Sequence, residues 1–506
     1  MDGTLPRGPA PSKKPFGFKN KHVKKQKKVA PKISSSITIN DYVQGCIVLG
    51  SIRSVEDDGL YIDLPGGHRG ILLFTEVNEY FLQRLQTAVE ENQTSFNTLT
   101  NFFKIESFIM AVVLSAGTNP VELSIRPELI NIGIPIEENS LFYAAVKSKE
   151  DNGYIIDIGR DEYKCFLPFT NLVGEKRNLE IGQPIYAKII KADKKTESKI
   201  LRFDLVDSSL AFPTVPESEP IFDDIRPYSV IDSIVKTNPP SGALKILVGG
   251  AFNGVCSKFS WPAGLNQGDS VRARPLLIDP AQKLLWMSTI PTIVEGKKPN
   301  CYNVKIGEIV DTEVLRIRSG VGIECLLNRD GSSIRIFIDL ATTEAENTIA
   351  AGETHRVRII ERRPIDDLLF AADDSETLNL EVFSVEDAIV GKVYNGTVVQ
   401  VHPKFGVFVK ISKFLTGLAP LAYCDNVEKL KKGSEVRAIV LSKANGQLRL
   451  ALKEKLIDSQ YKRILTYDDV RELIHKREEY EQKASELNLN TTKSETAQND
   501  DNVESE

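Results

Sequence analysis

A β-rich pattern that recurs five times is the feature that most constrains how this 506-residue chain folds. Each copy has a β-rich run, a short turn centred on a glycine, and a second β-rich run. Neighbouring turn glycines are 80 to 94 residues apart. Solenoid repeats are only about 20–50 residues long, so this period is that of a small domain. The turn glycines are Gly59, Gly153, Gly242, Gly322 and Gly406.

Each copy, here called unit one to unit five, continues with further short strands. A second marked position follows 11 or 12 residues after the turn and precedes another apolar run, as Gly417 does in unit five. Each unit then closes with a hairpin-like strand pair, which covers 436–441 and 448–452 in unit five. Five short strands without a long helical pattern match the five-stranded Greek-key OB barrel. We therefore expect an all-β chain of tandem OB barrels, because closure removes the exposed edges of a small sheet.

The predicted boundaries follow from these units and from composition. Unit one carries an insertion at 75–104, where apolar spacing near 3.6 residues predicts a partly helical segment. Units three and four keep the repeat only in degenerate form. We expect a disordered basic arm at 1–40, unit one at 41–130, unit two at 138–210, unit three at 222–292, unit four at 303–376, unit five at 388–455, and a short charged helix with an acidic tail at 456–506.

The first 40 residues are strongly basic although the whole chain has a net charge of -5. They hold nine lysines and Arg7 against one acid, Asp2, with too little apolar sequence to fold alone. Such an arm binds phosphate groups, directs nuclear import, or both; the alternative is a solvated leader without a specific partner. The arm residues expected to contact RNA are Arg7, Lys24, Lys25, Lys27 and Lys28.

Several classes of site find no support in the sequence. The six cysteines form no C-x-x-C pair and the five histidines are scattered, so we expect reduced, mostly buried thiols, no metal site and no cofactor. There is no clustered carboxylate set and no Gly-rich Lys-Ser/Thr phosphate loop, which predicts a protein without enzymatic activity or a small-molecule substrate. Acidic pairs such as Asp366-Asp367 are interpreted as turn and solubility residues. No apolar run is long enough to span a membrane, so no membrane partner is expected.

Unit five carries the clearest motif. It reads Gly396-Thr397-Val398-Val399, Lys404-Phe405-Gly406-Val407-Phe408-Val409, Thr416-Gly417-Leu418-Ala419-Pro420-Leu421 and Leu448-Arg449-Leu450-Ala451-Leu452-Lys453. This pattern resembles the S-one RNA-binding domain, an OB-fold module. Gly406 allows a bend that brings Phe405 and Phe408 onto one face, where aromatic rings stack on unpaired bases. The alternative for each ring is the barrel core, the default place for an aromatic in a strand.

Basic residues near these rings are candidates for phosphate contacts, with a solvated rim as the alternative. A loop of unit two has a comparable lysine patch. In units three and four, alternating arginines such as Arg272 with Arg274 and Arg356 with Arg358 place two guanidinium groups on one strand face. Tyr61, at the position of Phe408 in unit one, lies among acids and is assigned a structural role. The RNA-binding residues expected outside the arm are Phe405, Phe408, Lys404, Lys410, Lys443, Arg449, Lys194 and Lys195.

The whole array is similar to the N-terminal part of the eukaryotic ribosomal-RNA-processing protein five family. The resemblance rests on Leu5-Pro6-Arg7-Gly8 near the start, Leu64-Pro65-Gly66-Gly67 in unit one and Asp151-Asn152-Gly153-Tyr154 in unit two. It implies a nuclear and nucleolar factor that binds precursor ribosomal RNA and helps assemble early pre-ribosomal particles of the small-subunit processome. Implied partners are a small nucleolar ribonucleoprotein and other ribosome assembly factors. Family members are longer and include helical repeats, whose functions are not carried over. The alternative is a protein-binding scaffold whose barrels have lost their RNA contacts.

Overall fold

The structure is a computed structural model that describes most of the chain. The described residues are 35–91, 99–172, 178–192, 199–206, 221–237, 242–262, 264–318, 321–340, 343, 349–444 and 446–460. The predicted basic arm, the charged segment from 461 onward with the acidic tail, and the loop residues Lys194 and Lys195 lie outside the described residues.

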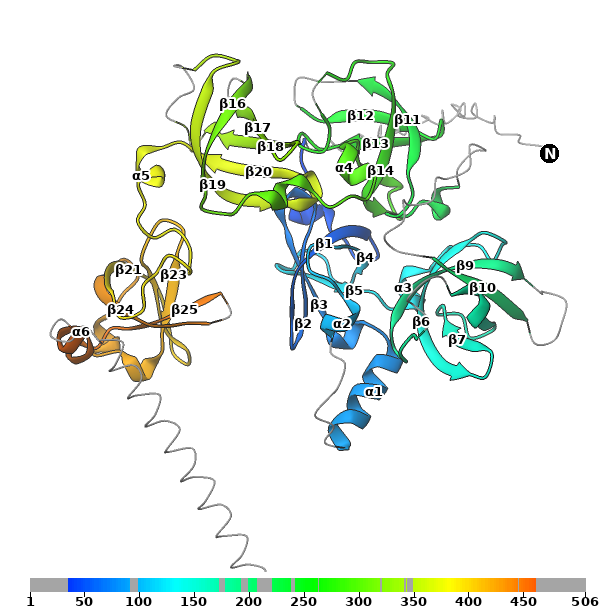
Figure 1. The fold of residues 1–506 in the computed structure, drawn as a ribbon, viewed down its shortest axis with the longest axis horizontal. Coiled ribbons are helices and arrows are strands. Elements are labelled where there is room, and N and C mark those ends of the chain that lie inside the picture. The colour runs from blue at the N-terminus through cyan, green and yellow to red at the C-terminus, as the bar shows by residue number, and fades with distance from the viewer. Residues whose placement is uncertain are drawn as a thin grey trace, which may run out of the picture.

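Each of the five units is a closed five-stranded barrel, and all five share one strand order (Figure 1). Within a unit, the first strand pairs with the second and fourth, the third pairs with the second and fifth, and the fifth pairs with the fourth. This arrangement confirms the predicted fold class of tandem OB barrels.

The strands occur in chain order within each unit. Unit one consists of β1 (Ile47–Glu56), β2 (Gly59–Asp63), β3 (Arg69–Leu73), β4 (Phe108–Val113) and β5 (Val121–Ser124). Unit two consists of β6 (Leu141–Glu150), β7 (Gly153–Asp157), β8 (Lys164–Pro168), β9 (Pro184–Ala192) and β10 (Ile200–Val206). Unit three consists of β11 (Ile231–Thr237), β12 (Leu244–Val248), β13 (Phe252–Cys256), β14 (Ser270–Asp279) and β15 (Leu284–Ser288). Unit four consists of β16 (Ile309–Arg318), β17 (Gly322–Arg329), β18 (Ser332–Asp339), β19 (Thr354–Arg363) and β20 (Leu368–Ala372). Unit five consists of β21 (Val393–His402), β22 (Gly406–Lys410), β23 (Thr416–Ala419), β24 (Glu435–Ala444) and β25 (Gln447–Ala451).

Alternation of side chains along the strands separates the core of each barrel from its outer surface. In β22, Val407 and Val409 are buried, so Phe408 between them points outwards. The first strand of every unit contains a bulge, which lies between Val398 and Gln400 in unit five. A bulge increases the local twist that a small barrel needs to close. The five units therefore share not only strand order but also register.

The turn glycine of unit five is required by close packing. Gly406 has a φ of +126°, which few L side chains adopt, and a Cβ added there would lie 2.8 Å from the Cα of Pro420. It would also collide with the carbonyl oxygen of Ala419. Both obstacles are backbone atoms, which cannot turn aside as a flexible side chain does.

We expect Gly406→Ala to lower the free energy of unfolding of unit five by about 2–3 kcal/mol, because backbone strain is added to a steric clash. Gly433→Ala is the matched control, since Gly433 also has a positive φ of +90° but has nothing within 4 Å of an added Cβ. Urea unfolding of both variants measures the difference. Equal losses for the two variants would show that the close packing at Gly406 is unimportant.

The helices are few and mostly short. The insertion of unit one contains α1 (Glu79–Glu90) and α2 (Leu99–Phe102), which confirms its predicted partly helical character. Asn78 caps α1 by accepting from the Phe81 N–H at 2.9 Å, and its amide donates to the Gly182 carbonyl of unit two at 2.9 Å. The other α-helices are α3 (Pro127–Ile130), α4 (Pro291–Val294), α5 (Ser375–Leu378) and α6 (Glu454–Gln460). In the part of the chain that the structure describes, no helix is long and apolar enough to cross a membrane.

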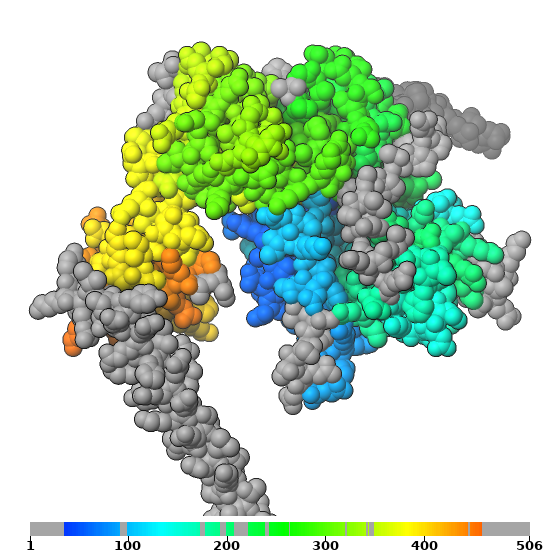
Figure 2. Space-filling view, in the orientation of Figure 1, coloured from blue at the N-terminus to red at the C-terminus, as the bar shows by residue number. Residues whose placement is uncertain are grey.

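Units one, three and four pack into one body, with unit two on one side and unit five on the other (Figures 1 and 2). Units one and three share a ten-stranded sheet, because β1 pairs with β14 through Ile47–Ile278 and Val48–Leu277. The repeat pattern alone indicated separate barrels. The difference arises because the first six residues of β1 are buried, so that its start lies between β4 and β14 rather than at a solvated edge.

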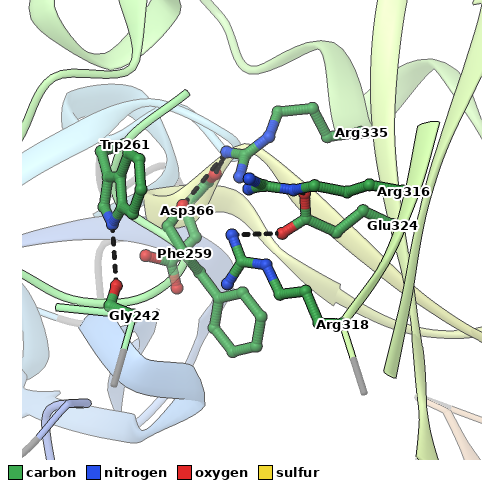
Figure 3. A network of polar contacts seen from close by, with 8 residues as sticks. All are labelled: Gly242, Phe259, Trp261, Arg316, Arg318, Glu324, Arg335 and Asp366. Atoms are coloured by element: carbon green, nitrogen blue, oxygen red, sulfur yellow. Dashed lines mark hydrogen bonds and ion pairs between the residues drawn. The ribbon is translucent and has the colours of Figure 1, made fainter. Parts of the chain in front are cut away.

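Two acids of the loop before β20 hold units three and four together, which corrects their assignment as solubility residues. Asp366 is buried and accepts a hydrogen bond from the Ser260 hydroxyl of unit three at 2.8 Å. Its backbone carbonyl accepts from the Arg335 guanidinium at 3.2 Å (Figure 3). Burial raises its pKa, although Arg363 and Arg335 oppose this shift. Asp367 accepts from the Thr292 hydroxyl at 2.6 Å and from the Cys301 N–H at 2.9 Å. These contacts come from residues far away in sequence, which the local acidic pair does not reveal.

Candidate nucleic-acid interface

One line of outward-facing residues crosses each barrel at an equivalent register. It takes one residue from each strand, starting just after the bulge of the first strand, and is here called the outer row. In unit five the pairings run from Gln400 to Phe408, from Phe408 to Leu418, from Leu418 to Arg449 and from Arg449 to Ser442. The sequence alone predicted Phe408 and Arg449 as site residues, and the register places them in one row, separated by Leu418.

The outer row of unit five is open. Phe408 and Leu418 are half-buried, whereas Gln400 and Arg449 are exposed. A half-buried ring beside an aliphatic side chain and an exposed guanidinium combines a stacking surface for a base with a contact for a phosphate. The row therefore has the chemistry of a single-stranded nucleic-acid platform.

A second aromatic surface lies at the turn between β21 and β22. Phe405 is 60% exposed, and its ring lies against His402 with centroids 4.5 Å apart and planes 31° apart. The Nδ1 atom of His402 accepts from the Lys404 N–H at 3.2 Å and from the Phe405 N–H at 3.3 Å. His402 was not among the sequence-predicted residues, although its position three residues before Phe405 in a tight turn indicates a contact between the two rings. The structure places the Phe405 ring in contact with the His402 ring. That Phe405 and Phe408 share one face stays a prediction.

The candidate lysines of unit five are in different situations. Lys404 and Lys410 are exposed. Lys410 lies two residues after Phe408 in β22 and pairs with Thr416 of β23. The ammonium of Lys443 donates to the Glu386 carbonyl at 2.9 Å, so it is held against the segment that precedes unit five. A phosphate contact by Lys443, as predicted, therefore requires its ammonium to exchange this hydrogen bond for one to RNA. The arm residues Arg7, Lys24, Lys25, Lys27 and Lys28 are outside the described residues.

The outer row of unit four is covered by unit three. It contains Arg316, Glu324, Phe337, Phe370 and Glu361. Phe259 of unit three packs edge-to-face on both rings, with centroids 5.0 Å from Phe337 and 5.3 Å from Phe370. Phe337 has no exposed surface, and Glu324 is held in ion pairs with two arginines of β16 (Figure 3). The face that is open in unit five is an interface between barrels here.

The outer row of unit three is covered in a similar way. It contains Thr237, Lys245, Val255, Trp286 and Leu277. Val255 and Trp286 are buried in the hydrophobic core that units one and three share. Leu277 lies in β14 opposite Val48 of unit one. Units three and four thus have degenerate sequences at positions that contact a neighbouring barrel.

Unit one has an open but acidic row. Tyr61 pairs across with Ser54 and Ile71, and Ile71 pairs with the exposed Glu122. The Tyr61 hydroxyl donates to the Asp58 carboxylate at 3.0 Å, and this bond raises the pKa of the tyrosine. Carboxylates beside the ring repel phosphate, so this row is poorly suited to RNA.

Two of the arginines that the sequence placed in pairs on one strand face are buried. Arg274 is fully buried and donates to the carbonyls of Pro227 at 2.7 Å and Ile293 at 2.8 Å. Arg358 is buried too and donates to the carbonyls of Gly307 at 2.9 Å and Leu380 at 2.8 Å. Both guanidinium groups therefore bind backbone carbonyls inside the protein and are not placed to contact phosphate.

The thiols and acids show no arrangement for metal chemistry within the described ranges. All six cysteines are free and buried, as predicted. No group of three or more His, Cys, Asp or Glu side chains in the described part of the chain is placed to hold a metal ion.

Curated proteins match the chain along most of its length. No protein-family model matches it. It is 26% identical over 473 residues to "rRNA biogenesis protein RRP5" of Arabidopsis thaliana, covering 87% of this chain and 24% of that protein. It is 24% identical over 482 residues to "Protein RRP5 homolog" of Homo sapiens, covering 86% of this chain and 25% of that protein. The chain thus spans about a quarter of the length of these curated relatives.

Solved structures add little to these matches. A multidomain protein with nucleic acid binding domains from Streptococcus pneumoniae is 14% identical, covering 44% of this chain and 73% of that chain, with a TM-score of 0.15.

Proposed function

The chain belongs to the RRP5 family of rRNA biogenesis proteins, and we propose that it binds single-stranded segments of precursor ribosomal RNA through the outer row of unit five. In this proposal it acts in the nucleolus during assembly of early pre-ribosomal particles, including the small-subunit processome. Its partners there are other assembly factors and a small nucleolar ribonucleoprotein. The observation that carries the proposal is the open row of Phe408, Leu418 and Arg449.

The chemistry of this row favours unpaired RNA over a duplex. A ring on the barrel surface stacks on a base only when that base is not already stacked in a helix. Each such stack contributes about 1–3 kcal/mol, and the neighbouring cations add contacts to the backbone phosphates. The exposed lysines Lys404 and Lys410 extend the cationic surface on the same hairpin.

We propose a binding role and not a catalytic one. The matched relatives are described as rRNA biogenesis proteins. The outer-row side chains are an aromatic ring, an aliphatic chain and a guanidinium, which hold a polynucleotide without making or breaking a bond. The protein thereby organises RNA that other factors process.

A second candidate function is that of a protein-binding scaffold. The covered rows of units three and four favour it, because they show that an outer row in this protein also serves as a protein interface. On this alternative the row of unit five accepts an aromatic side chain of an assembly factor in the way that unit four accepts Phe259. Loss of co-purifying assembly factors from a Phe405→Ala/Phe408→Ala variant, with RNA crosslinking unaltered, would favour the scaffold.

Fluorescence anisotropy with a labelled single-stranded RNA tests the RNA-binding proposal. We expect the Phe408→Ala/Arg449→Glu variant to bind about tenfold more weakly at low salt, because one base stack and one phosphate contact are lost. Lys432→Glu is the control, since Lys432 is an exposed cation of unit five outside the outer row. Wild-type affinity in the double variant, or an equal loss in the control, would contradict the proposal.

A further inference from the structure

Unit two carries a second open outer row, and we propose that it is another contact surface for single-stranded nucleic acid, centred on Phe166, Arg202 and Lys191. The inference rests on the proposed function, because it assigns an additional site to the same RNA-binding activity. Phe166 and Arg202 were not among the sequence-predicted contacts. Lys191 belongs to the lysine patch that the sequence indicated in unit two, of which Lys194 and Lys195 were the predicted RNA contacts.

The register brings the three side chains together. Ser148 pairs with Ile155, Ile155 with Phe166, Phe166 with Arg202, and Arg202 with Lys191. Cys165 and Leu167 on either side of Phe166 are buried, so the phenyl ring points outwards. This row resembles that of unit five, except that its aromatic residue lies in the third strand of the barrel instead of the second.

The ring of Phe166 lies at a position where, in unit four, the equivalent ring contacts another aromatic side chain. It lies over Gly153, where an added Cβ would be 2.7 Å from its Cζ atom. Phe337 of unit four lies over Gly322 in the same way, also at 2.7 Å. There the ring receives Phe259 at 5.0 Å, with the ammonium of Lys258 6.0 Å from its centroid. The third-strand ring is thus an established docking position, occupied in unit four.

In unit two the same position is surrounded by cations. Lys191 and Arg202 in the row, and Lys164 on the adjacent pairing with Ile200, are exposed, and no ion pair of their side chains is recorded among the described residues. Acids also lie near this row. Asp204 is paired across with Lys188, and Glu150 accepts from the Ser148 hydroxyl at 2.9 Å. The exposed Asp151, Asp161 and Glu162 lie close in sequence to Gly153 and Lys164. Three cations beside an accessible ring match a phosphate backbone with an unstacked base, and they match an apolar protein segment poorly.

Anisotropy titration of the full chain with a labelled mixed-sequence RNA of about 20 nucleotides, in wild type and variants, tests this site. We expect Phe166→Ala/Arg202→Glu to weaken binding about five- to tenfold at low salt. It should also flatten the dependence of log affinity on log salt by about 0.7 per lost phosphate contact. The control is Lys245→Glu, which makes the same kind of charge change in the outer row of unit three, whose ring is covered.

The outcomes separate this inference from the proposed function. Weaker binding by both the unit-two and the unit-five variants supports both. Loss only in Phe408→Ala/Arg449→Glu overturns the unit-two site and leaves the proposed function standing. No retention of RNA by the wild-type chain overturns the proposed function itself. Circular dichroism melting of each variant identifies misfolding, and the single substitution Arg202→Glu, at an exposed position, then replaces the double variant.

Discussion

Phe259→Ala is expected to lower the free energy of unfolding by about 3–5 kcal/mol, the range for deleting a large ring from a packed core. The ring of Phe259 joins units three and four by packing against Phe337 and Phe370. It also lies 5.8 Å from the guanidinium of Arg363 and 4.7 Å from the ammonium of Lys258. Its removal leaves a cavity between two barrels and exposes two further rings. Guanidinium chloride unfolding measures the loss, and hydrogen exchange of β18 and β20 locates it.

Phe405→Ala is the matched control for this substitution. It removes the same ring from a site that is 60% exposed, so a change within about 0.5 kcal/mol is expected. A loss for Phe259→Ala no larger than this, or unchanged hydrogen exchange in unit four, would contradict the assignment of the unit-four row as an interface.

Combining the substitutions in units two and five is expected to weaken binding of a long single-stranded RNA about a hundredfold or more. One OB barrel contacts roughly 4–16 nucleotides, and units two and five lie on opposite sides of the central body (Figure 1). An RNA long enough to reach both rows binds the second one intramolecularly, so the two affinities multiply. The prediction rests on the proposed function and on the second row together.

RNA length provides the control for this prediction. An oligonucleotide of about six residues is too short to bridge both rows, so each single-unit variant retains the affinity of the other row and shows little loss. Anisotropy with both RNA lengths measures the contrast, with Lys245→Glu/Lys432→Glu as the charge-matched protein. Equal losses of affinity for short and long RNA would show that the two rows do not bind the same RNA molecule.

The sequence predicted the barrels because their local signals are strong. The turn glycines require no tertiary information, since Gly406 and Gly322 are forced by the backbone of the strand opposite. For Phe408 the sequence left two places open, the barrel core and an exposed face, and the burial of Val407 and Val409 places its side chain on the outer side of β22. The partly helical insertion of unit one also followed from its apolar spacing.

Docking between the barrels could not be predicted in this way. Phe166 and Phe337 occupy equivalent positions in their strands, yet one is half-buried and the other completely covered. The difference depends on Phe259, which reaches unit four only in the folded arrangement. Asp366 and Arg274 were misassigned for the same reason, because their partners lie 106 and 47 residues away in sequence. Row residues such as Arg202 emerge only when strand register is known.

Ultraviolet crosslinking of the full chain to single-stranded ribosomal RNA, with crosslinked peptides identified by mass spectrometry, tests most directly whether the open outer rows hold the RNA. We expect crosslinks in peptides that contain Phe408 of unit five and Phe166 of unit two. None is expected at Phe337 or Trp286, whose rows are covered. Crosslinks concentrated in units three and four, with none on β22 or β8, would contradict RNA binding by the open rows.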